Sequence, residues 1–211
     1  MKEIHRITVG VWGINCYAVV DEADNCILID PGEEPQVIDE SLVMPNGWRP
    51  VALLATHGHL DHVGGARYFS EKYAISLYVH RDDIELANNV TYWADVLGTP
   101  GLANPVNIEP LETGKATIDN FDFQIIHTPG HTAGGACIYL EENQSVFTGD
   151  TLFFHSIGRS DRKGLDSGGH DILVASITER LFKLPGETTV FPGHGKSTTI
   201  DHERQHNPFL V

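Results

Sequence analysis

The sequence predicts an α/β fold in which two β-sheets pack against each other and helices cover their outer faces. Two strand-rich halves follow one another along the chain, and helical segments lie between the strands. This alternation fits a layered architecture in which each element turns its apolar face toward a neighbour. With 211 residues the chain is long enough for a substantial core, and we predict a single domain over residues 1–211.

The first half consists of short apolar runs bounded by turn residues. Its β-branched and apolar runs predict strands at residues 4–9, 17–20, 26–29, 51–55 and 75–79. Helices are predicted at 35–44, where Pro45-Asn46-Gly47 ends the helix, and at 64–73. The run at 51–55 is continuously apolar, which is typical of a fully buried strand.

The second half repeats this pattern. Strands are predicted at residues 116–118, 121–127, 136–140, 145–148 and 188–191. Leu173, Ile177 and Leu181 recur at helical spacing and predict a helix over 171–184. A short terminal helix is predicted from 202 to 206.

Residues 81–105 interrupt the pattern. Two helical stretches, 82–89 and 92–97, precede a loop that is rich in Gly and Pro. We predict a helical and loop insertion here, flanking the functional site. The alternative is a helix pair that caps the core with Tyr92 and Trp93 packed inward.

The charge balance excludes two classes of partner. Fourteen Lys and Arg against 29 Asp and Glu give a formal net charge of −15 with neutral histidines. Nucleic-acid backbones and anionic membranes are bound by clustered Lys and Arg, so neither is expected as a partner. No apolar run reaches the roughly 18 residues of a membrane span. A small anionic molecule is still compatible with this net charge as a ligand, because bound divalent cations would offset the negative charge at the site.

The cysteines and the N-terminus indicate the cytoplasm. Cys16, Cys26 and Cys137 are three in number and form no C-x-x-C pair, so a disulfide framework is not expected. We predict that these thiols are small buried apolar side chains on strands. The first residues lack the apolar core of a signal peptide, and a cytoplasmic location is therefore expected.

Four short motifs carry residue types that bind metals, and each follows a strand-like run. They are Thr56-His57-Gly58-His59-Leu60-Asp61-His62, Pro129-Gly130-His131-Thr132, Thr148-Gly149-Asp150-Thr151 and Pro192-Gly193-His194-Gly195. Each has glycine at or near the metal-binding residue type, as expected of side chains that project from strand ends into one cleft. Any one motif alone is more often a surface or turn feature, but the four together predict a metal site.

Zinc favours imidazole and carboxylate ligands. His57 and His59 point the same way on a strand or converge in a loop, whereas Asp61 and His62 lie where the next helix begins and face a second metal. Two metals roughly 3.5–4 Å apart usually share a ligand, a role that suits the Asp150 carboxylate. We therefore predict two divalent ions per chain, with zinc as the first choice and iron or manganese as alternatives.

These motifs resemble the signature of the metallo-β-lactamase superfamily, H-x-H-x-D-H followed by separate His, Asp and His ligands. Within it, the chain is similar to the short, single-domain bacterial glyoxalase II-like (hydroxyacylglutathione hydrolase-like) hydrolases. The similarity covers nearly the whole chain and includes Asn15-Cys16-Tyr17, Asp30-Pro31-Gly32, Thr56 to Gly65, Thr128 to Thr132, Phe147 to Phe153, Ser156 to Asp161 and Asn207-Pro208-Phe209-Leu210.

The resemblance implies a four-layer αββα sandwich with the metals at one edge. It also implies a ligand set, in which His57, His59 and His131 hold metal 1, Asp61, His62 and His194 hold metal 2, and Asp150 bridges them. The diiron oxygen reductases that share this pattern carry an acidic residue at the second histidine. Here that residue is His59, which favours the hydrolase branch.

Glutathione as the thiol carrier rests on weaker signals than the metal site. The chain ends about where the helical domain of two-domain glyoxalase II enzymes begins, and Arg159 and Asp161 stand where those enzymes have Lys and Tyr. Arg159 is a candidate for binding a substrate carboxylate through its guanidinium fork, and an Arg159–Asp161 structural pair is the alternative. His155 and His170 lie in the same region, where packing is the simpler role.

The expected activity is metal-assisted hydrolysis of a small-molecule thioester such as S-lactoylglutathione, with Asp61 and Asp150 positioning the attacking water. We expect Asp30, next to a turn, to support the site through hydrogen bonds. The first alternative is a persulfide (sulfur) dioxygenase with one iron on His57, His131 and Asp150. A lactonase or β-lactamase comes next, and the complete ligand set disfavours a non-catalytic metal-binding module.

Overall fold

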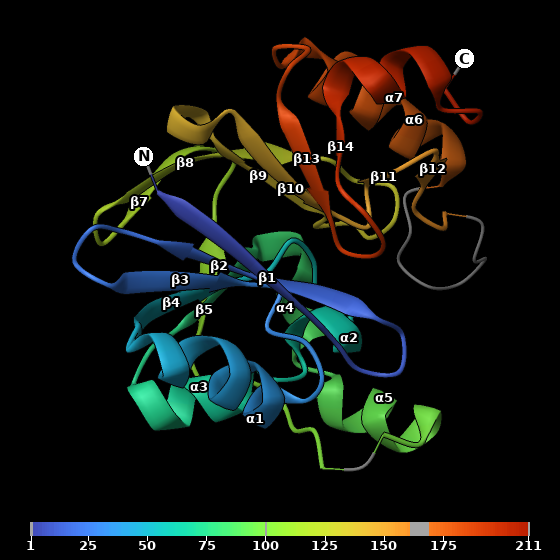
Figure 1. The fold of residues 1–211 in the computed structure, drawn as a ribbon. Helices are drawn as coiled ribbons and strands as arrows, with labels where there is room; N and C mark the ends of the chain where they lie inside the picture. The colour runs from blue at the N-terminus through green and yellow to red at the C-terminus, as the bar shows by residue number, and fades with distance from the viewer. Residues whose placement is uncertain (1, 100, 161–168, 211) are drawn as a thin grey trace.

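The structure is a computed structural model that describes residues 2–99, 101–160 and 169–210. Two six-stranded sheets form its centre (Figure 1). The first has the strand order β1-β2-β3-β4-β5-β6. Its strands are Glu3–Val9, Ile14–Val20, Asn25–Ile29, Arg49–Leu54, Leu77–His80 and Ile108–Leu111. Strands β1 to β3 are antiparallel, whereas β3 to β6 pair in parallel.

The second sheet has the order β14-β13-β10-β9-β8-β7. In chain order its strands are Gly114–Ile118, Phe121–His127, Ala136–Leu140, Ser145–Gly149, Thr189–Pro192 and Thr198–Thr199. Only the β10–β13 pair is parallel. A two-stranded hairpin, β11 (Leu152–Phe153) and β12 (Ser156–Ile157), follows β10.

Helices lie on the outer sides of both sheets (Figure 1). They are α1 (Pro35–Ile38), α2 (Leu60–Val63), α3 (Ala66–Tyr73), α4 (Ile84–Ala87), α5 (Val90–Leu97), α6 (His170–Glu179) and α7 (Ile200–His206). Short 3-10 or π segments complete them: η1 (Asp39–Val43), η2 (Met44–Asn46), η3 (Arg81–Asp83), η4 (Glu141–Asn143) and η5 (Leu181–Lys183).

Three apolar clusters correspond to the three interfaces between the layers. One includes Phe69 of α3 and lies between the first sheet and its helices. A second joins the two sheets, with Tyr17 from one and Phe147 from the other, whose rings are 5.2 Å apart. The third packs Leu173 and Ile177 of α6 against the second sheet. This αββα sandwich confirms the predicted fold class.

Several elements differ from the sequence prediction in their bounds. The helix predicted at 35–44 begins as α1 and continues through η1 and η2. Strands β6, β11, β12 and β14 were not predicted. In β6, Pro110 is unfavourable inside a sheet, but an edge strand tolerates it. In the 81–105 segment, Trp93 packs toward the first cluster, whereas Tyr92 is 60% exposed. The single domain with an insertion here stays a prediction.

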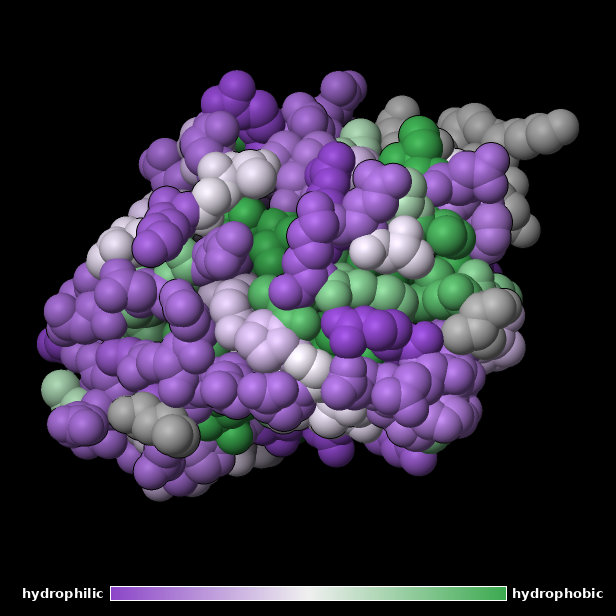
Figure 2. Space-filling model, turned by 90° about the horizontal axis from the view of Figure 1, so that it is seen from above, coloured by the Kyte–Doolittle hydropathy of each residue, from purple (hydrophilic) through white to green (hydrophobic). Residues whose placement is uncertain are grey.

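The surface agrees with the composition. Figure 2 shows a face that is mainly hydrophilic, with apolar atoms gathered toward the side on which α6 and α7 lie in Figure 1. Within the three described ranges, no helix is long and apolar enough to cross a membrane. All three cysteines are free and buried on strands, as predicted.

Candidate metal centre

The four motifs meet at one edge of the sandwich because each follows the end of a strand. The first follows β4, and its Asp61 and His62 occupy the first turn of α2, where His59 is the N-cap residue. The others come after β8, β10 and β13. The structure thus brings together all seven predicted residues: His57, His59, Asp61, His62, His131, Asp150 and His194.

Three histidines form one side of the centre. Possible ligand atoms of His57, His59 and His131 all lie within 4.8 Å of one another. Nδ1 of His59 and Nε2 of His131 are only 3.0 Å apart. Such converging ring nitrogens suit a single metal ion.

A second group lies next to the first. Asp61, His62 and His194 also offer atoms within 4.8 Å of one another. The Asp61 carboxylate oxygen Oδ2 lies 3.3 Å from Nε2 of His194 and 3.7 Å from Nε2 of His62.

Asp150 lies between the two groups and presents one oxygen to each. Its Oδ1 is 3.3 Å from Nε2 of His62 and 3.6 Å from Nε2 of His194. Its Oδ2 is 3.5 Å from Nε2 of His131. A carboxylate with this arrangement is suited to bridge two metal ions.

The hydrogen bonding of the centre fits bound metal. His57 Nε2, His62 Nε2 and Asp150 Oδ1 are buried and have no hydrogen-bond partner among the described residues. A buried polar atom without a partner costs free energy, so native structures almost always satisfy it. Five imidazoles and two carboxylates are ligands that zinc, iron and manganese accept. The residues present therefore fit a pair of divalent ions.

Burial lowers the pKa of two histidines in the first group. Burial and the neighbouring histidines lower the pKa of His57 well below its usual value. Burial, with His131 nearby, lowers the pKa of His59 to about 4. Both rings therefore keep a free lone pair for a metal at neutral pH.

In the second group the pKa shifts run the other way, because carboxylates surround the histidine. Burial alone would lower the pKa of His62, but the carboxylates of Asp30, Asp61 and Asp150 together raise it well above its usual value. Burial alone would raise the pKa of Asp150, yet the surrounding histidines hold it below its usual value. The site thus concentrates negative charge on carboxylates that a cation can neutralise.

Asp30 supports the centre in the way the sequence predicted. Its carboxylate is buried and lies 3.0 Å from Nδ1 of His62. It also accepts hydrogen bonds from the backbone N–H and the hydroxyl of Thr56, both at 2.8 Å. These contacts fix the His62 ring with Nε2 directed at Asp150.

Asp83 is a second supporting carboxylate, and sequence reasoning missed it. It is buried and accepts hydrogen bonds from the N–H of Gly58 (2.9 Å), the hydroxyl of Thr132 (2.7 Å) and the N–H of Gly134 (2.6 Å). It therefore ties the loop of His57 and His59 to the loop of His131. Its position at the start of a short helix resembles an ordinary capping residue, so no local signal distinguishes it.

A cavity of about 560 Å³ opens over the metal centre. His59, Asp61, His131, Asp150 and His194 form its polar floor. Its apolar walls are Trp12, Leu60, Leu86, Trp93, Leu97, Phe153 and Ile157. A cavity with apolar walls and a few convergent polar groups is typical of a small-molecule site.

Arg159 also lines this cavity, and its side chain is exposed at the rim. Its backbone carbonyl accepts a hydrogen bond from Nδ1 of His131 at 2.7 Å, which orients that ring. The possible partner Asp161 lies outside the described residues. His155 and His170 do not line the cavity within the described part of the chain.

Comparisons with known proteins agree with this geometry. Residues 9–194 match the model of the Metallo-beta-lactamase superfamily. The hydroxyacylglutathione hydrolase GloC of Haemophilus influenzae is 33% identical over 210 residues, which cover 98% of this chain and 97% of that protein.

Two crystal structures share the fold. BLEG-1, described as a B3 metallo-beta-lactamase, has a TM-score of 0.89 and 31% identity over 99% of this chain and 100% of its own. TTHA1623 in a di-iron-bound form has a TM-score of 0.86 and 37% identity over 98% of this chain and 100% of its own. The cluster offers the residues for a divalent-metal centre, and the resemblance seen in the sequence is confirmed: this chain is a metallo-hydrolase that belongs to the metallo-beta-lactamase superfamily.

Proposed function

We propose that this chain is a binuclear thioester hydrolase that acts on S-acylglutathione-type substrates, such as S-lactoylglutathione, and releases a carboxylic acid and a thiol. The placement of Asp150 between two groups of three ligands carries the proposal, because it suits a pair of metal ions rather than one. The similarity to GloC supports the substrate class. The three buried free thiols support a reducing, cytoplasmic location.

The ligand assignment follows the two groups of side chains. His57, His59 and His131 would hold one ion, and Asp61, His62 and His194 would hold the other. Asp150 would contribute to both. Bound ions supply a lowered pKa for a coordinated water and positive charge that polarises the thioester carbonyl. We assign zinc first, and the di-iron form of TTHA1623 keeps iron as the alternative.

The protein's own groups orient the reactants. Asp61 and Asp150 face the cavity and accept hydrogen bonds from the attacking water, which aims its oxygen at the carbonyl carbon. The leaving thiolate needs no strong protein acid, because a free thiol has a pKa of about 8.5. The apolar walls hold the acyl group, and the guanidinium of Arg159 at the rim attracts a carboxylate of the thiol carrier.

Two other reactions are candidates. BLEG-1 is described as a metallo-beta-lactamase, so a cyclic amide is a second substrate class. A dioxygenase with one iron on His57, His131 and Asp150 is the redox candidate, because iron is the metal bound in TTHA1623. The full set of Asp61, His62 and His194 weighs against a single-metal centre.

The test combines metal analysis with a substrate panel. Protein purified without added metal is expected to contain about two divalent ions per chain and to hydrolyse S-lactoylglutathione faster than a β-lactam or a lactone, with no oxygen uptake on glutathione persulfide. Asp61→Ala should lose one of the two ions and at least 10–100-fold in kcat/KM, the range known for lost supporting partners of metal sites. Retained iron with oxygen uptake in Asp61→Ala would contradict the proposal.

The thiol carrier is tested separately. Arg159→Ala should raise KM for S-lactoylglutathione with little change in kcat, because a rim contact is the same in the ground and transition states. Lys196→Ala is the matched control, since this cation packs over Phe154 and does not line the cavity. Equal kinetics in both variants would remove Arg159 from substrate binding without affecting the thioesterase assignment.

A further inference from the structure

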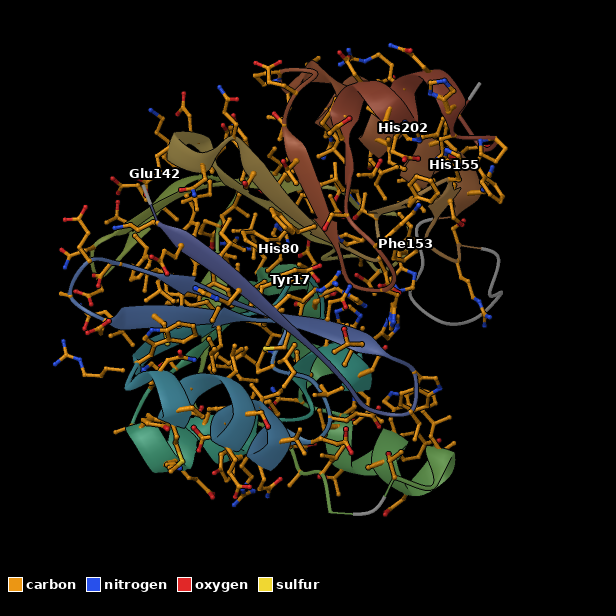
Figure 3. The ribbon with its side chains drawn as sticks, in the orientation of Figure 1. Tyr17, His80, Glu142, Phe153, His155 and His202 are labelled. Carbon is orange, nitrogen blue, oxygen red and sulfur yellow. The ribbon has the colours of Figure 1, made fainter. Side chains whose placement is uncertain are left out.

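We propose that His155 and His202 form a third metal site, separate from the two-metal centre, which takes a divalent transition-metal ion such as Zn2+. His155 lies in the turn between β11 and β12, and His202 lies in α7 (Figure 3). Neither residue lines the substrate cavity within the described ranges. The site does not depend on the reaction proposed above.

The two rings face each other through the nitrogens that bind metals. The Nε2 atoms of His155 and His202 are 2.7 Å apart, and the ring planes are within 4° of parallel. Phe154 stacks on both imidazoles, at 4.0 Å from His155 and 5.3 Å from His202. The two residues are 47 positions apart in the chain, so the fold rather than the local sequence brings these nitrogens together.

A third histidine lies one helical turn further along α7. The ring of His206 is 4.8 Å from the ring of His202, and the spacing of four residues places both on one face of the helix. Nδ1 of His206 contacts the carbonyl of His202 at 3.0 Å. Two histidines at this spacing form the imidazole pair of helical zinc sites. The group here whose possible ligand atoms lie within 4.8 Å of one another is His155, His202 and Glu203.

The turn that carries His155 is held in place by a buried carboxylate. His155 has a left-handed backbone with φ 55°, which is uncommon for a residue other than glycine. Its N–H donates to Oε2 of Glu203 at 2.9 Å, and Glu203 is fully buried. Thr198 and Asn207 donate to the same carboxylate. Glu203 therefore fixes the turn and brings negative charge within 4.8 Å of the two imidazole nitrogens.

The 2.7 Å separation of the two Nε2 atoms is that of a hydrogen bond, in which one Nε2–H donates to the other Nε2. When both rings carry their proton on Nδ1 instead, both Nε2 lone pairs are free for a metal ion. A tetrahedral zinc ion with bonds of 2.0–2.1 Å separates two nitrogens by roughly 3.3 Å, so the pair must open by about 0.6 Å and the two rings must turn toward the shared ion. The exposed position of His155 permits this movement.

A further histidine pair among the described residues, His80 and His127, lacks this geometry. His80 and His127 stack with their planes within 7° and centroids 4.2 Å apart, so their lone pairs lie side by side. Nε2 of His127 already contacts the carbonyl of Ala133 at 2.9 Å.

A metal at His155 and His202 would connect the cavity wall to the C-terminal helix. Phe153 and Ser156 line the cavity and flank the turn that carries His155. Figure 3 labels Phe153 and His155. An ion that joins this turn to α7 restricts the wall that contacts substrate. Because the two histidines are brought together only in the folded protein, the ion is expected to raise the free energy of unfolding.

The experiment is a zinc titration of the tag-free protein whose two-metal centre has been filled and whose excess metal has been removed. We expect calorimetry to show one further site in the wild type. His155→Gln and His202→Gln should each weaken this binding at least tenfold. His5→Gln is the matched control, because the half-exposed His5 contacts Glu3 and Trp48 and has no ring contact with another histidine in the described ranges. This variant should bind zinc like the wild type.

Two outcomes would overturn the proposal. Identical zinc binding in the wild type and in both variants would leave the pair as a hydrogen bond only. Spectra of the wild type labelled with 15N-histidine provide a test that needs no variant. The Nε2 resonances of His155 and His202 must shift together on zinc addition, and unshifted resonances would exclude the site.

Discussion

Two buried carboxylates, Asp30 and Asp83, divide the support of the metal centre between them. Asp30 contacts His62, a ligand of the second group. Asp83 holds the backbone of Gly58, between His57 and His59, and the loop that carries His131. Each carboxylate is therefore expected to influence one ion more than the other, because residues that orient ligands tune the affinity of the ion those ligands bind.

Replacement of Asp83 should lower the affinity of the protein for only one of the two ions. Asp83 accepts hydrogen bonds on both carboxylate oxygens from Gly58, Thr132 and Gly134. In Asp83→Asn the side-chain NH2 replaces one of these acceptors and faces a donor. We expect about a 10–100-fold loss of affinity for the ion of the three-histidine group, measured by chelator competition. Asp30→Asn should instead lower the affinity for the ion that His62 would bind.

Asp82→Asn is the control for this pair of variants. The Asp82 side chain is 51% exposed and lies 3.7 Å from Nδ1 of His80, away from the centre. It should leave both metal affinities unchanged. Equal loss of both ions in Asp83→Asn would show that Asp83 stabilises the fold in general rather than one half of the site.

Among the elements, the loops after the strands decide how closely the ligands approach. The loop after β13 brings the backbone of Gly193 against the centre. A Cβ atom at this glycine would lie 2.6 Å from Cε1 of His62 and 2.7 Å from Oδ1 of Asp150. These distances are shorter than any van der Waals contact, so the ligand geometry requires glycine here.

Gly193→Ala should therefore reduce metal content and activity together. The added methyl group must displace either the His62 ring or the Asp150 carboxylate, and we expect loss of at least one ion by elemental analysis. Gly47→Ala is the matched control, since Gly47 has φ 71° but open space around its Cβ position. It should cost about 1–2 kcal/mol of stability from backbone strain and keep both ions. Full metal content in Gly193→Ala would contradict the ligand assignment.

In the molecule as a whole, the metal centre lies where the two sheets are linked. The N–H of Asn15 in the first sheet donates to the carbonyl of Gly193 at 2.8 Å. The N–H of Ala136 in the second sheet donates to the carbonyl of Thr56 at 2.8 Å. The candidate ligands also follow strands of both sheets, so ions bound there would connect the two sheets.

Removal of the metals should consequently destabilise the entire sandwich. An ion present at 1,000 times its dissociation constant stabilises the native state by about 4 kcal/mol. For a protein of this size, that corresponds to a decrease in Tm of about 10 °C per ion on chelation. Calorimetry with and without EDTA measures this decrease, and zinc should restore the original Tm. An unchanged Tm after complete metal removal would contradict a linking role.

Local patterns were sufficient to predict most of the strands, the main helices and the residue types that could bind metals. Alternating or continuous apolar runs indicate strands wherever they occur in the chain. His57, Asp150 and His194 each follow such a run. Asp30 was predictable for the same reason, since it directly follows β3. Strand β6 was not, because only its place at the sheet edge makes Pro110 acceptable.

Contacts between distant segments required the tertiary structure. Asp83 reaches Gly58 across 25 positions and Thr132 across 49, and neither partner is marked in the sequence around it. The cavity walls combine Trp12 from the first hairpin with Trp93 from α5. Glu203 holds the turn of His155 against α7, where His155 meets His202. Apolar periodicity specifies which face of an element is buried, whereas the packing of all the layers determines which side chains meet.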